Sequence, residues 1–361
     1  MGFDCSSYDF TSPDSKSVFL YCPSLPAAIF FTVVFGLSTL THIFQAFYHH
    51  KWRLSWVIVM GAAWETTSFG LRAAATQKPV SDALGIPSSI LVYLSPLLIN
   101  AYAYMVLGRM VLYYLQDKRV AGIQAKWLTV IFVWLDIIAF LVQLVGASMA
   151  SFRDTGSDAT EQEKIDAANG QKLGLNIYMG GIGFQLFWIL VFSGFSWRFR
   201  AKAVMERNQG TGIHRDSSWG HLLIVLYFTL LMITIRIIFR LVEFSGGSFN
   251  TKLTMTESYF YVLEATPMAT ACLTWNIFHP GRFLVGPDSE FPRLTRKEKK
   301  AIKVEKKRAK EEKKYAKMED KQRHKEWKKE DKRMRRRGTN EMEMGPLRGS
   351  QTYRTDDIDP A

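Results

Sequence analysis

Long apolar stretches alternate with short polar links through the first 281 residues of the chain. About 20 residues of helix, at a rise of 1.5 Å each, cross a hydrocarbon core of roughly 30 Å. Seven stretches are long enough to do so, and they cover residues 26–47, 54–75, 88–115, 127–150, 173–197, 220–244 and 256–278. The pattern predicts an all-α integral membrane protein with seven transmembrane helices.

Charged side chains interrupt the apolar pattern inside the predicted spans. In the sixth stretch Arg236, Arg240 and Glu243 follow at spacings of four and three, so they share one helical face. Such groups are costly in hydrocarbon and are tolerated when they face a bundle interior or a wet cavity. The same reasoning selects further candidate site residues in the other spans, which are Glu65, Arg72, Asp136, Gln143, Gln185, Glu257 and Glu264.

The charge of the chain lies mostly in its last part. Of a net charge of +13, residues 282–361 contribute +10, from 26 Lys or Arg against 16 Asp or Glu. A basic segment directly after a membrane span indicates the cytosolic side by the positive-inside rule. With seven spans, the N-terminus is then outside. The predicted domains are an extracellular N-tail (1–25), a membrane domain (26–281) and a basic cytosolic tail (282–361).

The basic tail has its own predicted structure. Residues 293–337 mix Lys and Arg with Glu at helical pairing distances, which favours a solvated helix, and residues from 338 on are predicted to be disordered. The basic segment is expected to contact anionic lipid if it has a specific partner, and nucleic-acid binding is not predicted.

Three cysteines are present, at positions 5, 22 and 272. Cys5 and Cys22 lie in the N-tail, where a disulfide forms if the tail is outside the cytosol; two free thiols are the alternative. Cys272 lies in an apolar stretch and is expected in the core. No metal site is predicted: His42, His221 and His279 show no pair at helical ligand spacing, which disfavours a zinc-dependent lipid hydrolase.

Several short motifs, each present once, follow one another along the spans. They are Tyr21-x-Pro23-Ser24, Glu65-x-x-Ser68-Phe69-x-x-Arg72, Pro96 followed by Asn100-Ala101-x-x-Tyr104-x-x-Leu107-Gly108-Arg109, Asp136 with Gln143-x-x-Gly146, Gly174 with Gly181 to Gln185, Arg236-x-x-x-Arg240-x-x-Glu243 with Gly246, Glu257-x-x-x-Tyr261 with Pro267-Met268, and His279-Pro280-Gly281. In this order the chain resembles the fungal lipid-translocating exporter family, which includes the aminocholesterol-resistance and sphingoid long-chain-base exporters. It departs from the family pattern at Glu264, where an aspartate is common, and at Phe69, where a tyrosine is common.

The resemblance implies a transporter or translocase of lipids or lipid-like amphiphiles, linked to tolerance of toxic lipids, in the plasma membrane or an endomembrane. Sphingoid bases and porphyrin or haem are both implied as cargo. A seven-span sensor or receptor for such lipids is the alternative. No phosphate-binding Gly-x-x-x-x-Gly-Lys-Ser/Thr segment is present, so neither a nucleotide cofactor nor enzymatic activity is expected.

Two interpretations of the buried charges remain open. They form either a structural core that pairs helices or a ligand site. A cationic headgroup needs a carboxylate that no arginine already pairs, and Glu65 and Glu264 are the candidates. An anionic headgroup would instead bind Arg236 or Arg240, whose guanidinium groups hold phosphate or carboxylate through two hydrogen bonds.

Overall fold

The computed structural model describes residues 19, 21–78, 81–151, 160–210, 219–245, 251–291 and 296–343. The chain divides into two compact units, Met1–Phe291 and Pro292–Ala361, and each is considered by itself. Cys5 and Gly246 lie outside the described residues, so the Cys5–Cys22 disulfide stays a prediction. Cys272 is free and buried, as expected.

Helices occupy all seven predicted positions, which confirms the all-α fold class. They are α1 (Leu25–Tyr48), α2 (Trp52–Ala75), α3 (Asp82–Tyr114), α4 (Ala125–Ser151), α5 (Glu161–Asn208), α6 (Trp219–Phe244), and a last helical track made of α7 (Glu257–Phe260), a π-helix (Tyr261–Ala265) and α8 (Thr266–Ile277). Strands β1 (Arg119–Val120) and β2 (Ile123–Gln124) form an antiparallel hairpin between α3 and α4. Short 3-10 turns at Pro280–Arg282 and Pro287–Ser289 follow α8.

Five of these helices are long and apolar enough to cross a membrane, namely α1, α3, α4, α5 and α6. The other two candidates, α2 and the last track, are not in this set. Helix α2 carries Arg53, Glu65 and Arg72, which lower its apolar content, and the last track is divided by the π-helix.

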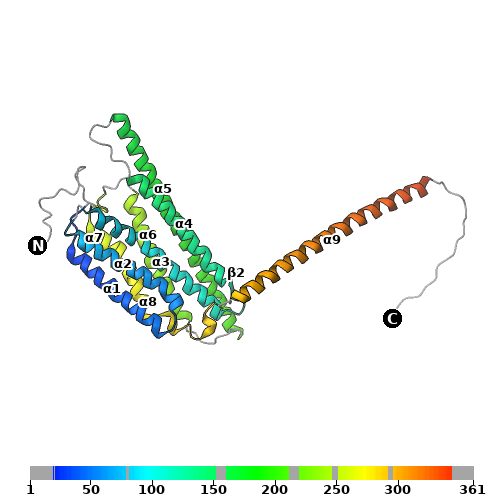
Figure 1. The fold of residues 1–361 in the computed structure, drawn as a ribbon, viewed down its shortest axis with the longest axis horizontal. Coiled ribbons are helices and arrows are strands. Elements are labelled where there is room, and N and C mark those ends of the chain that lie inside the picture. The colour runs from blue at the N-terminus through cyan, green and yellow to red at the C-terminus, as the bar shows by residue number, and fades with distance from the viewer. Residues whose placement is uncertain are drawn as a thin grey trace. The chain divides into compact units, whose positions relative to one another are not determined.

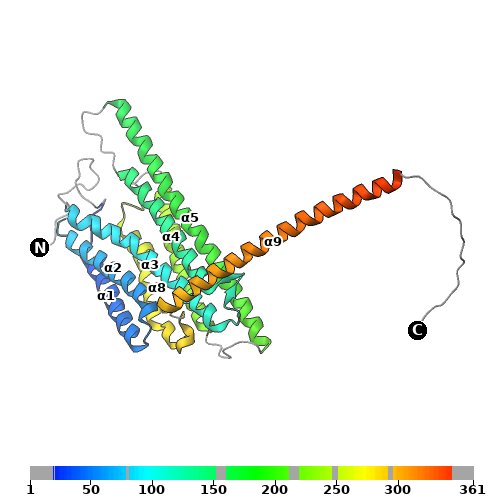
Figure 2. The ribbon, with the colours of Figure 1, turned by 45° about the vertical axis from the view of Figure 1, so that its right-hand side comes forward.

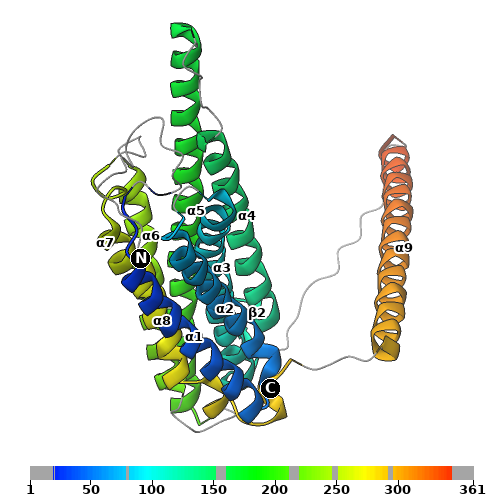
Figure 3. The ribbon, with the colours of Figure 1, turned by 60° about the vertical axis from the view of Figure 1, so that its left-hand side comes forward.

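The helices of the first unit pack as a closed ring. Each of α1 to α6 contacts the next along the chain, α6 packs against α8, and α8 returns to α1. Helix α3 also contacts α6 across the ring, and it is the most buried of the five apolar helices. Figure 2 shows α4 and α5 running side by side, and Figure 3 shows α1 next to α8 on another side of the bundle.

Helix α5 is longer than predicted. Residues 161–172 belong to a segment expected to be a polar loop, but they are helical, and α5 extends beyond its neighbours at one end of the bundle (Figure 1). The Thr160 hydroxyl accepts a hydrogen bond from the Glu163 N–H, and the Glu163 carboxylate accepts one from the Thr160 N–H. This capping box satisfies backbone N–H groups at the N-terminus of α5 and so stabilises a helix that begins at Glu161.

The helix of the second unit also continues past its predicted end. Helix α9 covers Arg296–Glu343, so residues 338–343, predicted to be disordered, are helical. A glycine inside a helix costs only about 1 kcal/mol relative to alanine, so Gly338 by itself does not end the helix.

The last helical track contains a wide turn directly before a proline. The Thr266 N–H donates to the carbonyl of Tyr261, five residues earlier, and the Thr266 hydroxyl donates to the same oxygen. Pro267 has no N–H and its ring crowds the preceding turn, which a wider turn relieves. The π-helix also sets the direction in which Glu264 points.

Glycines bring α4 and α5 into close contact. A Cβ atom at Gly146 would lie 2.3 Å from the backbone nitrogen of Tyr178, and one at Gly174 would lie 2.6 Å from that of Ala150. At Gly181 the nearest atom would be the Gln143 side chain at 2.8 Å, whereas Gly180 and Gly183 have nothing within 4 Å. Of these three neighbouring glycines, Gly181 therefore lies in the close helix contact, and the other two do not.

We expect Gly146→Ala to lower the free energy of unfolding by about 1–3 kcal/mol, because the new methyl group forces two backbones apart. Gly180→Ala is the matched control and should be neutral or stabilising by about 0.5–1 kcal/mol, since it replaces an unhindered helical glycine. Thermal unfolding of both detergent-solubilised variants measures the difference. Equal melting temperatures would contradict the close α4–α5 contact.

Candidate functional site

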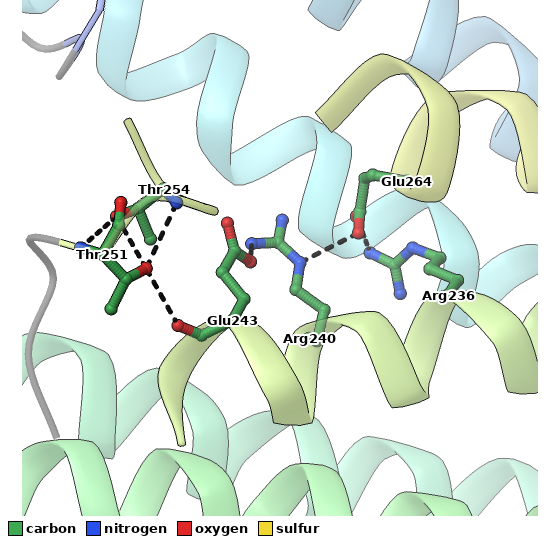
Figure 4. Close-up of polar contacts among 6 residues, drawn as sticks. All are labelled: Arg236, Arg240, Glu243, Thr251, Thr254 and Glu264. Atoms are coloured by element: carbon green, nitrogen blue, oxygen red, sulfur yellow. Dashed lines mark hydrogen bonds and ion pairs between the residues drawn. The ribbon is translucent and has the colours of Figure 1, made fainter. Parts of the chain in front are cut away.

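Two arginines and two glutamates form a buried ion cluster, defined by Arg236, Arg240, Glu243 and Glu264 (Figure 4). Glu264 lies between the arginines: its carboxylate is 2.5 Å from Arg236 Nη2 and accepts a hydrogen bond from Arg240 Nε at 2.9 Å. Arg240 Nη1 donates to Glu243 at 2.8 Å. Three of the four come from α6 at the spacings that the sequence indicated, and Glu264 comes from the π-helix.

The cluster is closed at the end of α6 by the segment that follows it. The Thr251 hydroxyl donates to the backbone carbonyl of Glu243, and the Thr251 N–H donates to the Thr254 hydroxyl at 2.9 Å (Figure 4). Thr251 thus donates to a backbone carbonyl in the last turn of α6, where carbonyl groups have no hydrogen-bond partner within the helix.

The prediction that Glu264 is an unpaired carboxylate was wrong. It contacts both arginines, because the wide turn of the π-helix and the three- and four-residue spacing on α6 place all four groups on facing helix surfaces. Sequence spacing describes one helix at a time, so it did not predict which residue of another helix would pair with α6.

Glu65, the other candidate, forms no ion pair with any of the described residues. Its residue is 1% exposed, and neither carboxylate oxygen has a hydrogen-bond partner among the described residues. The nearby Ser95 hydroxyl donates instead to the backbone carbonyl of Gly61 at 2.7 Å. Glu65 therefore keeps its acceptor capacity, close to Arg236 and Glu264.

Arg72 and Glu257 form a second site, which holds the chain before α1. Arg72 donates to the hydroxyls of Tyr261, at 3.2 Å, and of Tyr21, and its Nη2 lies 3.5 Å from Glu257. The other oxygen of Glu257 accepts the backbone N–H of Ser24 at 2.8 Å. The Arg72 guanidinium also lies 4.3 Å from the centre of an aromatic ring, that of Phe260.

Asp136 is held apart from the ion cluster. It accepts hydrogen bonds from the Asn100 amide at 3.1 Å and from the Tyr104 hydroxyl at 2.9 Å, both on α3. These bonds join α3 to α4, which is the kind of contact that the structural interpretation of the buried charges expects.

A pocket opens beside the ion cluster, between α3, α4, α5 and α6. Arg236 and Arg240 form its charged lining, and Gln143 and Gln185, hydrogen-bonded to each other at 3.0 Å, form a polar wall. The rest is apolar or aromatic, including Pro96, Leu97, Phe140, Leu144 and Ile182. We call this the arginine pocket.

Both arginines keep a donor that nothing else uses. Arg236 Nε and Arg240 Nη2 are buried and have no hydrogen-bond partner among the described residues. Because a buried guanidinium N–H without a partner is unfavourable, these groups favour a ligand or water that accepts a hydrogen bond.

A second pocket lies between the two charged groups, and its lining includes Arg72, Arg240, Glu243 and Tyr93. Arg240 and Tyr93 belong to the lining of both pockets, and the guanidinium lies 4.3 Å from the centre of the Tyr93 ring. The Arg240–Tyr93 contact therefore stands between them.

Sequence reasoning did not select Tyr93 or Tyr178, which line the arginine pocket. Tyr93 lies three residues before Pro96 in an apolar stretch, and no spacing signal connects it to Arg240. Tyr21 and Tyr261 belong to the motifs Tyr21-x-Pro23-Ser24 and Glu257-x-x-x-Tyr261, which carry the family resemblance. These motifs were the sequence signal that pointed to the two tyrosines, which contact Arg72.

The fold and these buried charges define a class, an α-helical membrane protein with a polar interior. Residues 58–286 match the family described as RTA1 like protein. The chain is 40% identical over 289 residues to the probable lipid transporter atnI of Emericella nidulans, which covers 78% of this chain and 72% of that relative. No solved structure matches the chain.

Two further relatives are more distant. The chain is 29% identical over 293 residues to the lipid-translocating exporter-like protein RTA1 of Leptosphaeria maculans, covering 76% of this chain and 53% of that one. It is 26% identical over 219 residues to protoporphyrin uptake protein 1 of Saccharomyces cerevisiae, covering 60% and 65%. The chain belongs to the RTA1-like family and is an integral membrane protein.

We expect Glu264→Gln to destabilise the protein by about 3–5 kcal/mol, because it leaves two buried guanidinium groups without their shared carboxylate. Glu243→Gln is the control: Arg240 keeps its bond to Glu264, so the loss should be smaller. Thermal unfolding in detergent measures both. A Glu264→Gln variant as stable as the unmodified protein would show that the cluster does not hold α6 to the last helix.

Proposed function

We propose that this protein moves a lipid or lipid-like amphiphile across or out of a membrane, most simply the plasma membrane, and so contributes to tolerance of toxic lipids. The observation that carries the proposal is the arginine pocket, a cavity with an apolar wall and a charged end inside a helix bundle. An amphiphile has the same two parts. The names of the relatives, which include a lipid transporter and a lipid-translocating exporter-like protein, support it.

The proposal includes seven spans, with the N-terminus outside and the C-terminus cytosolic. Helix α2 has 24 residues and is about 36 Å long at 1.5 Å per residue, which suffices to cross the bilayer. Its charged groups Glu65 and Arg72 are buried in the bundle, so they do not face lipid. Glu257–Ile277 is long enough despite its wide turn, and the basic C-terminal part favours the cytosol.

The chemistry of the pocket favours an anionic headgroup. Its charged lining is Arg236 and Arg240, each with an unused N–H, whereas Glu264 is consumed by both arginines. Phosphate or carboxylate would accept bonds from these donors in the forked geometry that guanidinium groups prefer. The name of the protoporphyrin relative is compatible with a carboxylate-bearing cargo.

A sphingoid long-chain base is the second candidate cargo, and Glu65 is the observation that favours it. Its unpaired carboxylate near the cluster offers the partner that a cationic amine needs. Glu65 is not part of the arginine pocket lining, so a cation would have to reach it from another direction.

The first test is flux of a fluorescent amphiphile into vesicles containing only this protein. Leu144→Trp, which fills the arginine pocket, should reduce the rate several-fold. Leu141→Trp, an equal change at a comparably exposed position of α4 outside the pocket, should leave it unchanged. Flux equal to that of empty vesicles, with folded protein and several amphiphiles, would favour a lipid sensor instead.

The second test compares headgroups on the same acyl chain: phosphate, phosphocholine and amine. We expect the phosphate form to move fastest, and Arg236→Gln to slow it about tenfold through loss of one charged hydrogen bond. Arg198→Gln removes an equal charge outside the pocket and is the control. Fastest transport of the amine, abolished by Glu65→Gln, would contradict the anionic preference and support the sphingoid base.

A further inference from the structure

A separate basic pocket lies at the opposite end of the bundle from α7, where α2 and α4 begin and α3 ends. Its lining includes Arg53 on α2, Arg109 on α3 and Lys126 on α4. The remaining lining is Met105, Thr129, Val130 and Phe291. None of the transport-site residues belongs to it, so it is independent of the proposed transport.

Arg109 is the central group of this basic pocket. Its side chain is 6% exposed, and its Nη1 has no hydrogen-bond partner among the described residues. Arg109 forms an ion pair with Glu290 at 3.8 Å from that nitrogen, a distance that is too long for a hydrogen bond. Arg109 lines the pocket, and a buried, charged N–H without a hydrogen-bond partner is stabilised by an anion that accepts its bond.

Positive charge exceeds negative charge around Arg109. Besides the three cations of the lining, Lys51 lies close by and donates to the Ser289 hydroxyl at 2.6 Å. The pKa of Lys51 is below its usual value because of burial and the positive charge of Arg109, which Glu290 opposes. Among the described groups that interact with Arg109 or Lys51, Glu290 is the carboxylate, and it carries one negative charge against these four cations.

The backbone adds to the same potential. Arg53 and Lys126 are the second residues of α2 and α4, two helices of 24 and 27 residues whose N-termini thus meet at the pocket. The free N–H groups and the dipole of a helix N-terminus favour negative charge. Two helix N-termini and three cationic side chains together favour the binding of a compact, highly charged anion.

We propose that this basic pocket binds the phosphate group of an anionic ligand, and that the phosphate belongs to a lipid headgroup. Met105, Val130 and Phe291 give the pocket an apolar wall, which a soluble anion would not use. Basic pockets between membrane helices on the cytosolic side are suited to phosphorylated headgroups, and the proposed topology places this end there. The ligand would join α2, α3 and α4.

The test measures binding to the full-length protein in detergent by native mass spectrometry and by thermal shift. The probes are dioctanoyl phosphatidic acid, dioctanoyl phosphatidylcholine and inorganic phosphate. We expect phosphatidic acid to bind and to raise the melting temperature, and phosphatidylcholine to bind at least about tenfold more weakly, since its headgroup carries no net charge.

Three variants locate the site. Arg109→Gln and Lys126→Gln should each weaken phosphatidic acid binding about tenfold, and Arg198→Gln, an exposed cation outside the pocket, should not. Lys126 is exposed, so its variant is informative even if Arg109→Gln fails to fold. Equal binding by Lys126→Gln and the unmodified protein, or equal binding of both lipids, would overturn the proposal. Inorganic phosphate binding as tightly as phosphatidic acid would overturn the lipid assignment and leave a soluble phosphate as the ligand.

Discussion

The pairing of Glu264 with Arg236 and Arg240 is the constraint on which the membrane unit depends. Guanidinium groups in a helix that is otherwise apolar must be neutralised inside the bundle, and one carboxylate from the last helical track does this for both. The contact fixes the rotation of α6 and the position of the π-helix together. Since α8 packs on both α6 and α1, it also completes the ring of helices.

The same constraint shapes the arginine pocket. Glu264 occupies one side of each guanidinium group, and both arginines also line the pocket between α3, α4, α5 and α6. The close contact of α4 and α5 at Gly146 and Gly174 leaves Gln143 and Gln185 on the wall opposite the arginines. A structural core and a ligand site are therefore two sides of one cluster, and the two interpretations of these charges do not exclude each other.

Charges at the two ends of the bundle have different surroundings. Near α7, Arg72 is surrounded by tyrosine hydroxyls, aromatic rings and Glu257, which also binds the backbone at the start of α1. At the other end, Arg109 forms one ion pair, with Glu290 at 3.8 Å, and lines an open pocket. The hydrogen-bond donors of Arg72 thus find partners within the protein, whereas the surroundings of Arg109 favour a bound anion. Buried charge by itself does not separate a structural residue from a binding residue; the hydrogen-bond partners do.

The sequence by itself determined the all-α fold, the positions of all seven helices and the single face shared by Arg236, Arg240 and Glu243. These follow from apolar length and helical spacing, which are local properties. Only the tertiary structure decided that Glu264 is consumed while Glu65 is not, that Asp136 binds α3, and that Tyr93 contacts Arg240. The physical reason is that pairing between helices depends on their relative rotation, which the π-helix before Pro267 and the glycine contacts of α4 and α5 set through packing.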